Sequence, residues 1–454
     1  MSGAVRARHG ESIMNSNDKT VGVIGAGIVG VCTALTLQRQ GFKVTIIDPN
    51  PAGEGASFGN AGCFNGSSVV PMSMPGMITS VPKWLLDPMG PLSIRLGYFH
   101  KITPWLVQFL LAGQPAKVEE QARALRSLIG NTVPLITSLA KEAGAEHLLR
   151  HEGHLYVYRT EAQFAKDQGG WELRRSNGVT SNILNADELR DFDPNLSRAF
   201  TKGILIKENG HTTNPHELVT LLFKKVIANG GILVSSRVTG FEVNGQILSA
   251  VETENGKVNL DAAVIAAGAH SKPLAALLGD NVPLDTERGY HIVIRDPEVQ
   301  PRIPTTDAVG KFIATPMETG LRIGGTVEFA GLDAAPNWKR ADVLYDHARA
   351  LLPAIASVRP EDRYTKWMGY RPSVPDSLPV IGYARRTPNV VYAFGHGHLG
   401  MTGAPMTAML VSELISGMKP SIDLSPFSPS RFSKAGKKSS GSKFLKSPAS
   451  KNSV

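Results

Sequence analysis

The chain has 454 residues, a length that fits two or three domains of ordinary size. Hydrophobic residues make up 42% of it and charged residues 19%, a balance that excludes global disorder and allows a large buried core. Its two cysteines, Cys32 and Cys63, exclude a disulfide framework and a cysteine-rich zinc site. No uninterrupted apolar run reaches the roughly 18 residues that predict a transmembrane helix.

Most of the net charge of +9 lies in the last part of the chain. Residues 421–454 hold seven Lys or Arg against one Asp and contribute +6, which leaves +3 for residues 1–420. The body of the protein is nearly balanced, so its charge does not argue for a nucleic-acid-binding fold. Because residues 421–454 are rich in Ser, Gly and Pro without an apolar period, we expect a disordered basic tail there. Weak contact of this tail with anionic lipid or nucleic acid is the alternative.

We expect a flexible N-terminus over residues 1–19, which lacks the apolar core of a secretory signal. Residues 20–48 then predict a strand, a helix and a second strand. The motif GAGIVG at 25–30 joins the first strand to the helix. Gly25 allows the tight turn, Gly27 lets a pyrophosphate approach the backbone, and Gly30 lets helix and strand pack closely. The helix N-terminus can hold phosphates, and Asp48 stands where a carboxylate accepts hydrogen bonds from ribose hydroxyls. This pattern predicts dinucleotide binding and leaves NAD and FAD both open.

Three later segments bear on which dinucleotide is bound. Residues 55–65 form a loop of Gly, Asn and Ser, which suits close approach of a large flat cofactor. A strand breaks at glycine near residue 268, and a second does so near residue 395 before an apparent helix. Such strand-then-glycine signals, spread over the whole chain, indicate one nucleotide domain assembled from separate pieces, with a second domain inserted between them.

The segment 78–112 is rich in Trp, Leu and Phe and is broken by four prolines. Its clusters around Trp84 and Trp105 predict either an interfacial membrane anchor or helices packed against a substrate sheet. The inserted domain continues with strands over 153–158, 311–316 and 321–329.

With these motifs in place, the sequence resembles the FAD-dependent amine and amino-acid oxidoreductases, the group of D-amino-acid oxidase, glycine oxidase and sarcosine oxidase, and most closely the bacterial D-amino-acid dehydrogenases. The resemblance spans about residues 20–420. It is carried, in order, by GAGIVG (25–30), SFGNAG (57–62), AAGAHS (266–271), ERGYH (287–291), RIGGTVEF (322–329), GYRPSVPDSLPVIG (369–382) and GHGHLGMT (395–402).

The resemblance implies an α/β fold with a Rossmann-like, discontinuous FAD-binding domain and an inserted mixed-sheet substrate domain. We expect the FAD-binding domain over 20–79, 201–281 and 371–420, and the substrate-binding domain over 80–200 and 282–370. The residues expected to bind FAD are Gly25, Ala26, Gly27, Ile28, Val29, Gly30, Asp48, Asn60, Ala61, Gly62, Val238, Gly268, Gly397, Leu399, Gly400, Met401 and Thr402.

The resemblance also implies the substrate residues. Arg371 would grip a substrate carboxylate, a task that suits the paired donors of a guanidinium; the alternative is an ordinary surface ion pair, and Asp376 is a candidate partner. His398 would lie near the substrate, and Tyr290 and His291 either point into the pocket or are packed aromatics. No metal site is expected, because no third ligand cluster accompanies the His396–His398 pair.

The predicted function is FAD-dependent oxidative deamination of D-amino acids to 2-oxo acids, with electrons passed to a quinone or an electron-transfer protein. Two alternatives remain open: a D-proline or D-hydroxyproline dehydrogenase, and a glycine- or sarcosine-type oxidase that uses oxygen. We expect a cytoplasmic protein with peripheral contact to the inner membrane, and no nucleic-acid partner.

Overall fold

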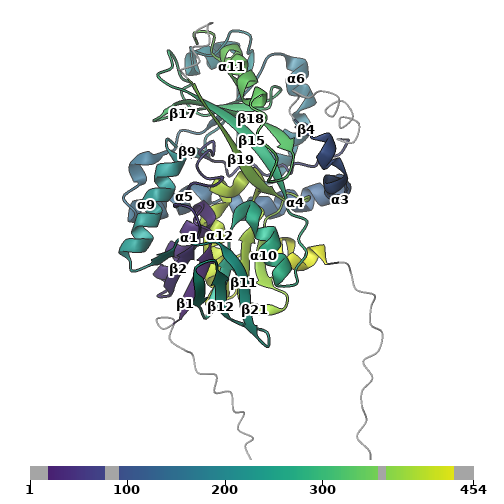
Figure 1. Ribbon diagram of the computed structural model, residues 1–454. Coiled ribbons are helices and arrows are strands. Elements are labelled where there is room, and N and C mark those ends of the chain that lie inside the picture. Colours follow the sequence, from purple (N-terminus) through teal and green to yellow (C-terminus); the bar gives the residue numbers. More distant parts are fainter. Residues whose placement is uncertain (1–18, 77–91, 356–363, 434–454) are drawn as a thin grey trace, which may run out of the picture.

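The computed structural model describes residues 19–76, 92–355 and 364–433. A six-stranded sheet forms one layer, in the order β10-β2-β1-β14-β21-β20 (Figure 1). Five of its strands are parallel and β20 is antiparallel to β21. Since these strands come from widely separated parts of the sequence, the discontinuous Rossmann-like layer is confirmed. The strands are β10 (Ile232–Val234), β2 (Lys43–Ile47), β1 (Thr20–Ile24), β14 (Ala262–Ile265), β21 (Thr387–Phe394) and β20 (Val380–Ala384).

Both faces of this sheet are covered. One core contains apolar side chains of five helices: α1 (Ile28–Arg39), α4 (Pro115–Ile129), α5 (Thr132–Glu142), α9 (Pro215–Ala228) and α12 (Gly400–Ile415). A second core lies between the other face and α10 (Ser271–Leu277) with a three-stranded meander of β11 (Val238–Asn244), β12 (Ile247–Thr253) and β13 (Gly256–Asn259). The central strands are buried on both faces, as their continuous apolar sequence predicts.

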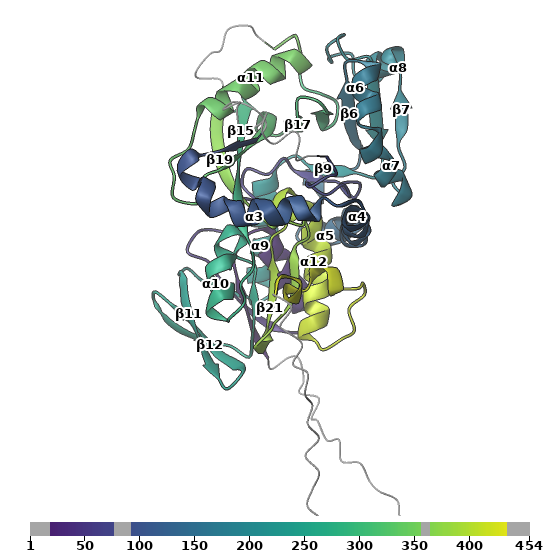
Figure 2. The same ribbon diagram turned by 90° about the vertical axis from the view of Figure 1, so that its right-hand side faces the viewer.

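A nine-stranded mixed sheet forms the second layer, in the order β19-β15-β18-β17-β16-β6-β8-β7, with β4 also paired to β18. Figure 1 shows β15, β17, β18 and β19 above the Rossmann-like layer, with α11 (Lys339–Leu351) beyond them. Figure 2 shows α6 (Glu161–Lys166), α7 (Gln168–Ser176) and α8 (Ala186–Phe192) beside β6 and β7. The strands are β19 (Tyr364–Ser373), β15 (Asp285–Ile294), β18 (Gly320–Phe329), β17 (Phe312–Met317), β16 (Thr305–Asp307), β6 (His154–Tyr158), β8 (Lys202–Ile206), β7 (Asn182–Leu184) and β4 (Leu92–Ile94).

Short elements join the two layers. A small sheet consists of β3 (Cys63–Phe64), β9 (Gly210–Thr212) and β5 (Leu149–Arg150). Helix α3 (Phe99–Ala112) runs between the layers in Figure 2. Short 3-10 helices include η3 (Leu96–Tyr98), η4 (Glu146–Leu148), η5 (Gly268–His270) and η7 (Gly397–Leu399). Within the described ranges no helix is long and apolar enough to cross a membrane.

The alternation of side chains along β15 separates the two faces of the nine-stranded sheet. Tyr290, Ile292 and Ile294 are buried in one core with side chains of α11. Gly289 and His291 lie on the opposite face and line the cavity described below. The face of β15 that carries Gly289 and His291 is therefore the one turned away from α11.

Three predicted domain boundaries differ from the structure. Residues 202–206 form β8 and pair with β6 and β7, so they belong to the nine-stranded sheet. Residues 371–373 are the end of β19 in the same sheet. Helices α4 and α5, expected in the substrate domain, share the core of the Rossmann-like layer. The amphipathic pattern of these helices predicts burial on one side, but it does not say which layer buries them.

The expected disorder of residues 421–454 is wrong for its first part. Residues 425–427 and 429–432 form η8 (Ser425–Phe427) and η9 (Pro429–Phe432), and Phe427 is fully buried. Arg431 forms an ion pair with Asp376 at 2.8 Å and donates to the carbonyl of Phe427 at 2.7 Å. These contacts dock the segment on the Rossmann-like layer, which a composition-based prediction misses. Residues 1–18, 434–454 and the Trp84 cluster lie outside the described residues.

Candidate cofactor and substrate site

A cavity of about 1340 Å³ is lined by residues from both layers. Pockets for single small ligands usually measure roughly 300–1,000 Å³, so this one has room for a dinucleotide and a second small molecule. Its lining includes Gly25 and Asp48 from the Rossmann-like layer, and His291 and Arg371 from the nine-stranded sheet.

The predicted glycine turn has the geometry that its spacing demands. Gly25 has a φ of +113°, and a Cβ built on it would lie 2.4 Å from the carbonyl oxygen of Ala266. A Cβ on Gly30 would lie 1.9 Å from the carbonyl oxygen of Gly25. Gly30 does not line the cavity; it lets α1 pack against the turn, so its contribution to binding is indirect.

Two helix N-termini open onto this cavity. Residues 26–29 at the start of α1 and residues 397–402 at the start of α12 line it, and neither helix has a side-chain N-cap. The Ile28 N–H donates to the Ser57 hydroxyl at 3.0 Å. The other N–H groups of these first turns and the positive helix ends favour anionic or electron-rich ligand groups. Thr402, in the first turn of α12, donates to the carbonyl of Cys63 at 3.1 Å and ties the helix to the neighbouring loop.

Asp48 and the loop after it border the same cavity. The Asp48 carboxylate accepts the backbone N–H groups of Ala26 and Asn50, each at 2.8 Å, which fixes it beside the glycine turn. Each oxygen keeps a further lone pair for a ribose hydroxyl. Asn60 accepts the N–H of Gly62 at 2.8 Å. Gly62 has a φ of +75° and supports the loop from outside the cavity lining.

The structure therefore brings the predicted cofactor residues together. Apart from Gly30 and Gly62, all of them line the cavity: Gly25, Ala26, Gly27, Ile28, Val29, Asp48, Asn60, Ala61, Val238, Gly268, Gly397, Leu399, Gly400, Met401 and Thr402. The uncapped helix ends, the close-packed glycines and the fixed carboxylate suit the phosphates and ribose of FAD. No group of His, Cys, Asp and Glu among the described residues is placed to hold a metal ion.

Arg371 lies on the cavity face of β19, and its guanidinium is available to bind a ligand. Within the described chain, no hydrogen bond or ion pair engages its guanidinium. Asp376, the partner considered from sequence, pairs with Arg431 instead. The register neighbour of Arg371 is Glu287, which is 2% exposed and accepts the Ser373 hydroxyl. Burial raises the pKa of Glu287 and lowers that of Arg371, and each charge opposes the shift of the other.

The two predicted site histidines border the cavity as neutral rings. His398, in η7, has its pKa lowered to about 4, first by desolvation and then by the charge of Arg371. Desolvation, with Arg322 nearby, lowers the pKa of His291 to about 3. The Nδ1 of His291 lies 3.0 Å from the carbonyl oxygen of Gly59, so that nitrogen carries the proton.

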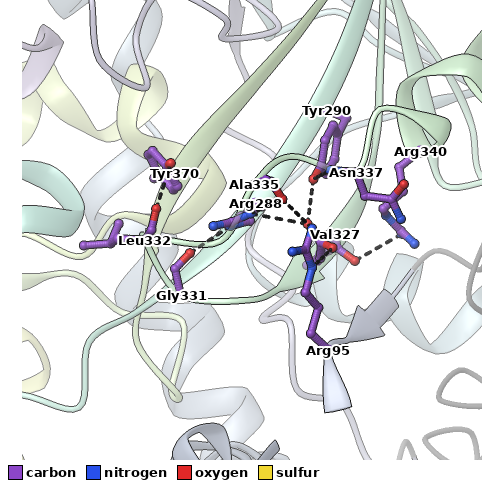
Figure 3. A network of polar contacts seen from close by, with 11 residues as sticks. Arg95, Arg288, Tyr290, Val327, Gly331, Leu332, Ala335, Asn337, Arg340 and Tyr370 are labelled. Atoms are coloured by element: carbon purple, nitrogen blue, oxygen red, sulfur yellow. Dashed lines mark hydrogen bonds and ion pairs between the residues drawn. The ribbon is translucent and has the colours of Figure 1, made fainter. Parts of the chain in front are cut away.

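Tyr290 also borders the cavity, but its hydroxyl is engaged by the protein. Its hydroxyl donates to Glu328 at 2.6 Å and accepts the N–H of Asn337 at 3.0 Å. Figure 3 shows it turned toward the buried cluster that also contains Arg95 and Arg288. Because side chains alternate along β15, Tyr290 packs in the α11 core while His291 lies on the opposite face, and a catalytic role of Tyr290 stays a prediction.

Sequence reasoning missed two cavity residues. Arg322 is 7% exposed, donates to the carbonyl of Asn60 and has its pKa lowered to about 10 by burial. Trp367 stacks on His291, with ring centroids 5.0 Å apart and 17° between the rings. Both stand on the cavity face of a strand, a signal that appears only once the register of the sheet is known.

Comparison with known proteins agrees with this geometry. The chain is 46% identical over 415 residues to a D-amino-acid oxidase of Bradyrhizobium diazoefficiens, an alignment that covers 91% of this chain and 98% of that one. It is 29% identical to D-amino acid dehydrogenase 2 of Ralstonia nicotianae, over 90% of this chain and 99% of that one. The crystal structure of glycine oxidase from Geobacillus kaustophilus has the same fold, with a TM-score of 0.68, 21% identity, and coverage of 92% of this chain and 100% of that one. Residues 20–414 match the family described as FAD dependent oxidoreductase (DAO), and the chain therefore belongs to this family of FAD-dependent enzymes.

Proposed function

We propose that this enzyme oxidises D-amino acids to 2-oxo acids and ammonia. The observation that carries the proposal is the uncommitted guanidinium of Arg371 in the cavity wall, close enough to His398 for its charge to act on that ring. The D-configuration is supported by the names of the relatives at 46% and 29% identity.

Arg371 binds the substrate carboxylate in this proposal. A carboxylate can accept two parallel N–H bonds from a guanidinium, which fixes position and orientation together. Because no described residue competes for these donors, the substrate replaces water rather than a protein partner. Gly289 makes this arrangement possible, since the guanidinium occupies the space that a side chain there would fill.

The reaction asks for little acid–base chemistry from the protein. The α C–H hydrogen leaves with its electron pair while the neutral amine lone pair forms the C=N bond, and water then hydrolyses the imine to the 2-oxo acid and ammonia. FAD, when bound, supplies the two-electron acceptor for this chemistry. With pKa values of about 4 and 3, His398 and His291 are neutral at pH 7 and are weak bases, so they shape the site instead of taking a proton.

For the final acceptor we propose a quinone or an electron-transfer protein, in line with the dehydrogenase relatives. The relative named D-amino-acid oxidase favours oxygen as a second candidate. Contact with a membrane is part of the first candidate. Leu96 is 93% exposed, and Phe99, Val107 and Leu111 on α3 are each close to half exposed. These side chains form an apolar strip at the cavity, because Phe99 and Val107 also line it.

Product and acceptor assays test the proposal directly. The FAD-loaded protein is incubated with the D- and L-forms of alanine, proline and phenylalanine and with glycine. Ammonia and 2-oxo acid are quantified, and for proline, whose nitrogen stays in the ring, the cyclic imine is measured instead. We expect D-specific product formation, faster with a soluble quinone than with air. Product formed from L-amino acids only would overturn the proposal, and equal rates in air alone would replace the quinone by oxygen.

Binding to vesicles tests the membrane contact. The holoprotein is mixed with vesicles that contain anionic lipid, and its co-flotation is measured. Leu96→Ser combined with Leu111→Ser should abolish co-flotation while ammonia production with a soluble acceptor stays intact, because neither residue lines the cavity. Co-flotation that is unchanged in this variant would refute a role for the strip.

A further inference from the structure

Two glycines form a part of the cavity wall beside Arg371 that carries no side chains. Gly289 on β15 and Gly369 on β19 face each other in register, and both line the cavity. A Cβ built on Gly289 would lie 2.4 Å from Nη2 of Arg371. A Cβ on Gly369 would lie 1.9 Å from Cη2 of Trp367. The guanidinium and the indole ring therefore occupy the space above two paired glycines.

These contacts limit the distance between the two side chains. Cβ positions of directly opposed residues in an antiparallel pair are about 4.5–5.5 Å apart, so Nη2 of Arg371 and Cη2 of Trp367 are at most about 10 Å apart. The two groups are therefore near enough for one amino acid to place its carboxylate on Arg371 and its side chain against Trp367. We call the space bounded by Arg371, Trp367, Gly289 and Gly369 the glycine-floored niche.

Trp367 is a fixed wall of this niche. Its ring stacks on His291 and also rests on the backbone of Gly59, where a Cβ would lie 2.2 Å from the ring. The ring of Phe58 lies 6.4 Å away, between centroids. His291 is in turn held by the carbonyl of Gly59 at 3.0 Å. A ring packed in this way can support a ligand without first losing conformational freedom.

The charge around the niche is one-sided. Arg371 supplies a cation for one carboxylate, and the buried Glu287 lies next to it in register. The facing aromatic wall is neutral, because burial keeps the pKa of His291 far below 7. The Arg322 guanidinium beside His291 is the cation nearest to this wall, and it donates to the backbone carbonyl of Asn60. A second charge on the substrate would meet indole and imidazole rings in place of water, at a cost in desolvation.

From this arrangement we propose that Trp367 determines substrate specificity: with the carboxylate on Arg371, the side chain of the amino acid packs on the indole ring, so neutral apolar D-amino acids are preferred to glycine and to D-amino acids with charged side chains. The inference rests on the proposed function, since it assigns the substrate class of the same site.

Substitution of Trp367 changes the ranking of substrates if this is correct. In Trp367→Ala, kcat/KM for D-phenylalanine and D-leucine should fall by about tenfold or more, the range for loss of an aromatic contact and its apolar area. The value for glycine, which has no side chain to pack, should change less than about threefold. Trp367→Phe should recover most of the loss. Trp338→Ala is the matched control, because Trp338 is 42% exposed and lies outside the cavity lining.

A binding measurement separates this inference from the proposed function. Phenylacetate and acetate are titrated into the FAD-loaded protein, and the change in its visible absorption gives each dissociation constant. Trp367→Ala should weaken phenylacetate about tenfold and leave acetate unchanged. If no D-amino acid is oxidised, the proposed function fails, but the titration still tests whether an apolar group binds against Trp367. The inference would be overturned if both Trp367→Ala and Trp367→Phe retain FAD and the ratio of the phenylacetate to the acetate dissociation constant stays within twofold of the wild-type ratio. If Trp367→Ala does not retain FAD, the same ratio of dissociation constants is measured in Trp367→Leu and decides the question.

Discussion

Gly289→Ala probes the substrate clamp without removing its charge. The backbone of Gly289 does not need a positive φ, so alanine fits the strand itself. Its Cβ would lie 2.4, 2.5 and 2.7 Å from Nη2, Cζ and Nε of Arg371, far inside van der Waals contact, and the guanidinium must move. The variant therefore keeps the cation and misplaces its donors.

The size of the effect follows from the hydrogen bonds that are lost. A bond to a charged group contributes about 1.5–3 kcal/mol, which corresponds to roughly a 10- to 150-fold lower kcat/KM for a D-amino acid. Affinity for FAD should stay within about threefold, because Gly289 lies in the nine-stranded sheet and the glycine turn that we propose to hold the cofactor lies in the other layer.

The assay is steady-state oxidation of D-alanine, with FAD affinity from fluorescence quenching as a second readout. Gly324→Ala is the matched control: Gly324 sits on the neighbouring strand, and its added Cβ meets only ordinary contacts at 3.7 and 3.9 Å. If Gly289→Ala and Gly324→Ala lower kcat/KM equally, or if Gly289→Ala changes nothing, the assignment of Arg371 as the clamp is refuted.

Three further predictions concern the rest of the molecule. Gly30→Ala places a Cβ 1.9 Å from the carbonyl oxygen of Gly25, so FAD affinity measured by fluorescence quenching should fall at least about tenfold; retention of normal affinity would contradict the packing role of Gly30. Arg431→Ala should lower the free energy of unfolding by about 1–3 kcal/mol in urea denaturation, while Arg175→Ala, which breaks an exposed pair, should cost less than about 0.5 kcal/mol; equal losses would mean that the docked segment adds nothing. Burial lowers the pKa of His396 to about 4, so between pH 6.5 and 4 the unfolded chain binds a proton at this residue and the folded chain does not. The free energy of unfolding should therefore fall over this range as the pH is lowered, by up to about 1.4 kcal/mol per pH unit for this residue. An unchanged slope in His396→Asn would contradict this.

The sequence predicts the cofactor half of the site well because its requirements are local. The glycine spacing, the strand before it and Asp48 are set within one short unit, and each has a fixed physical role in that unit. The strand-to-glycine signals near residues 268 and 395 likewise place Gly268 and the start of α12 against the cavity. A reader of the sequence can find these without knowing the tertiary structure.

The substrate half depends on information that a local pattern does not carry. Whether Tyr290 or His291 faces the cavity is fixed by the phase of β15 relative to α11, and one residue of slip would exchange them. Trp367 can form a wall because its ring lies over two glycines, Gly369 on its own strand and Gly59 in a distant loop. The docking of Arg431 on Asp376 is equally non-local, so composition alone places that segment in a disordered tail.

Anaerobic reaction with D-alanine tests the central claim most directly. The FAD-loaded protein and its Arg371→Met variant are mixed with D-alanine and, separately, with L-alanine, and the absorbance of the oxidised flavin is followed. We predict rapid bleaching of the wild type by D-alanine, little by L-alanine, and a rate at least about 100-fold lower in the variant, since two charge-assisted hydrogen bonds are lost. Bleaching at the same rate in the variant, or none by any D-amino acid in the wild type, would contradict the account.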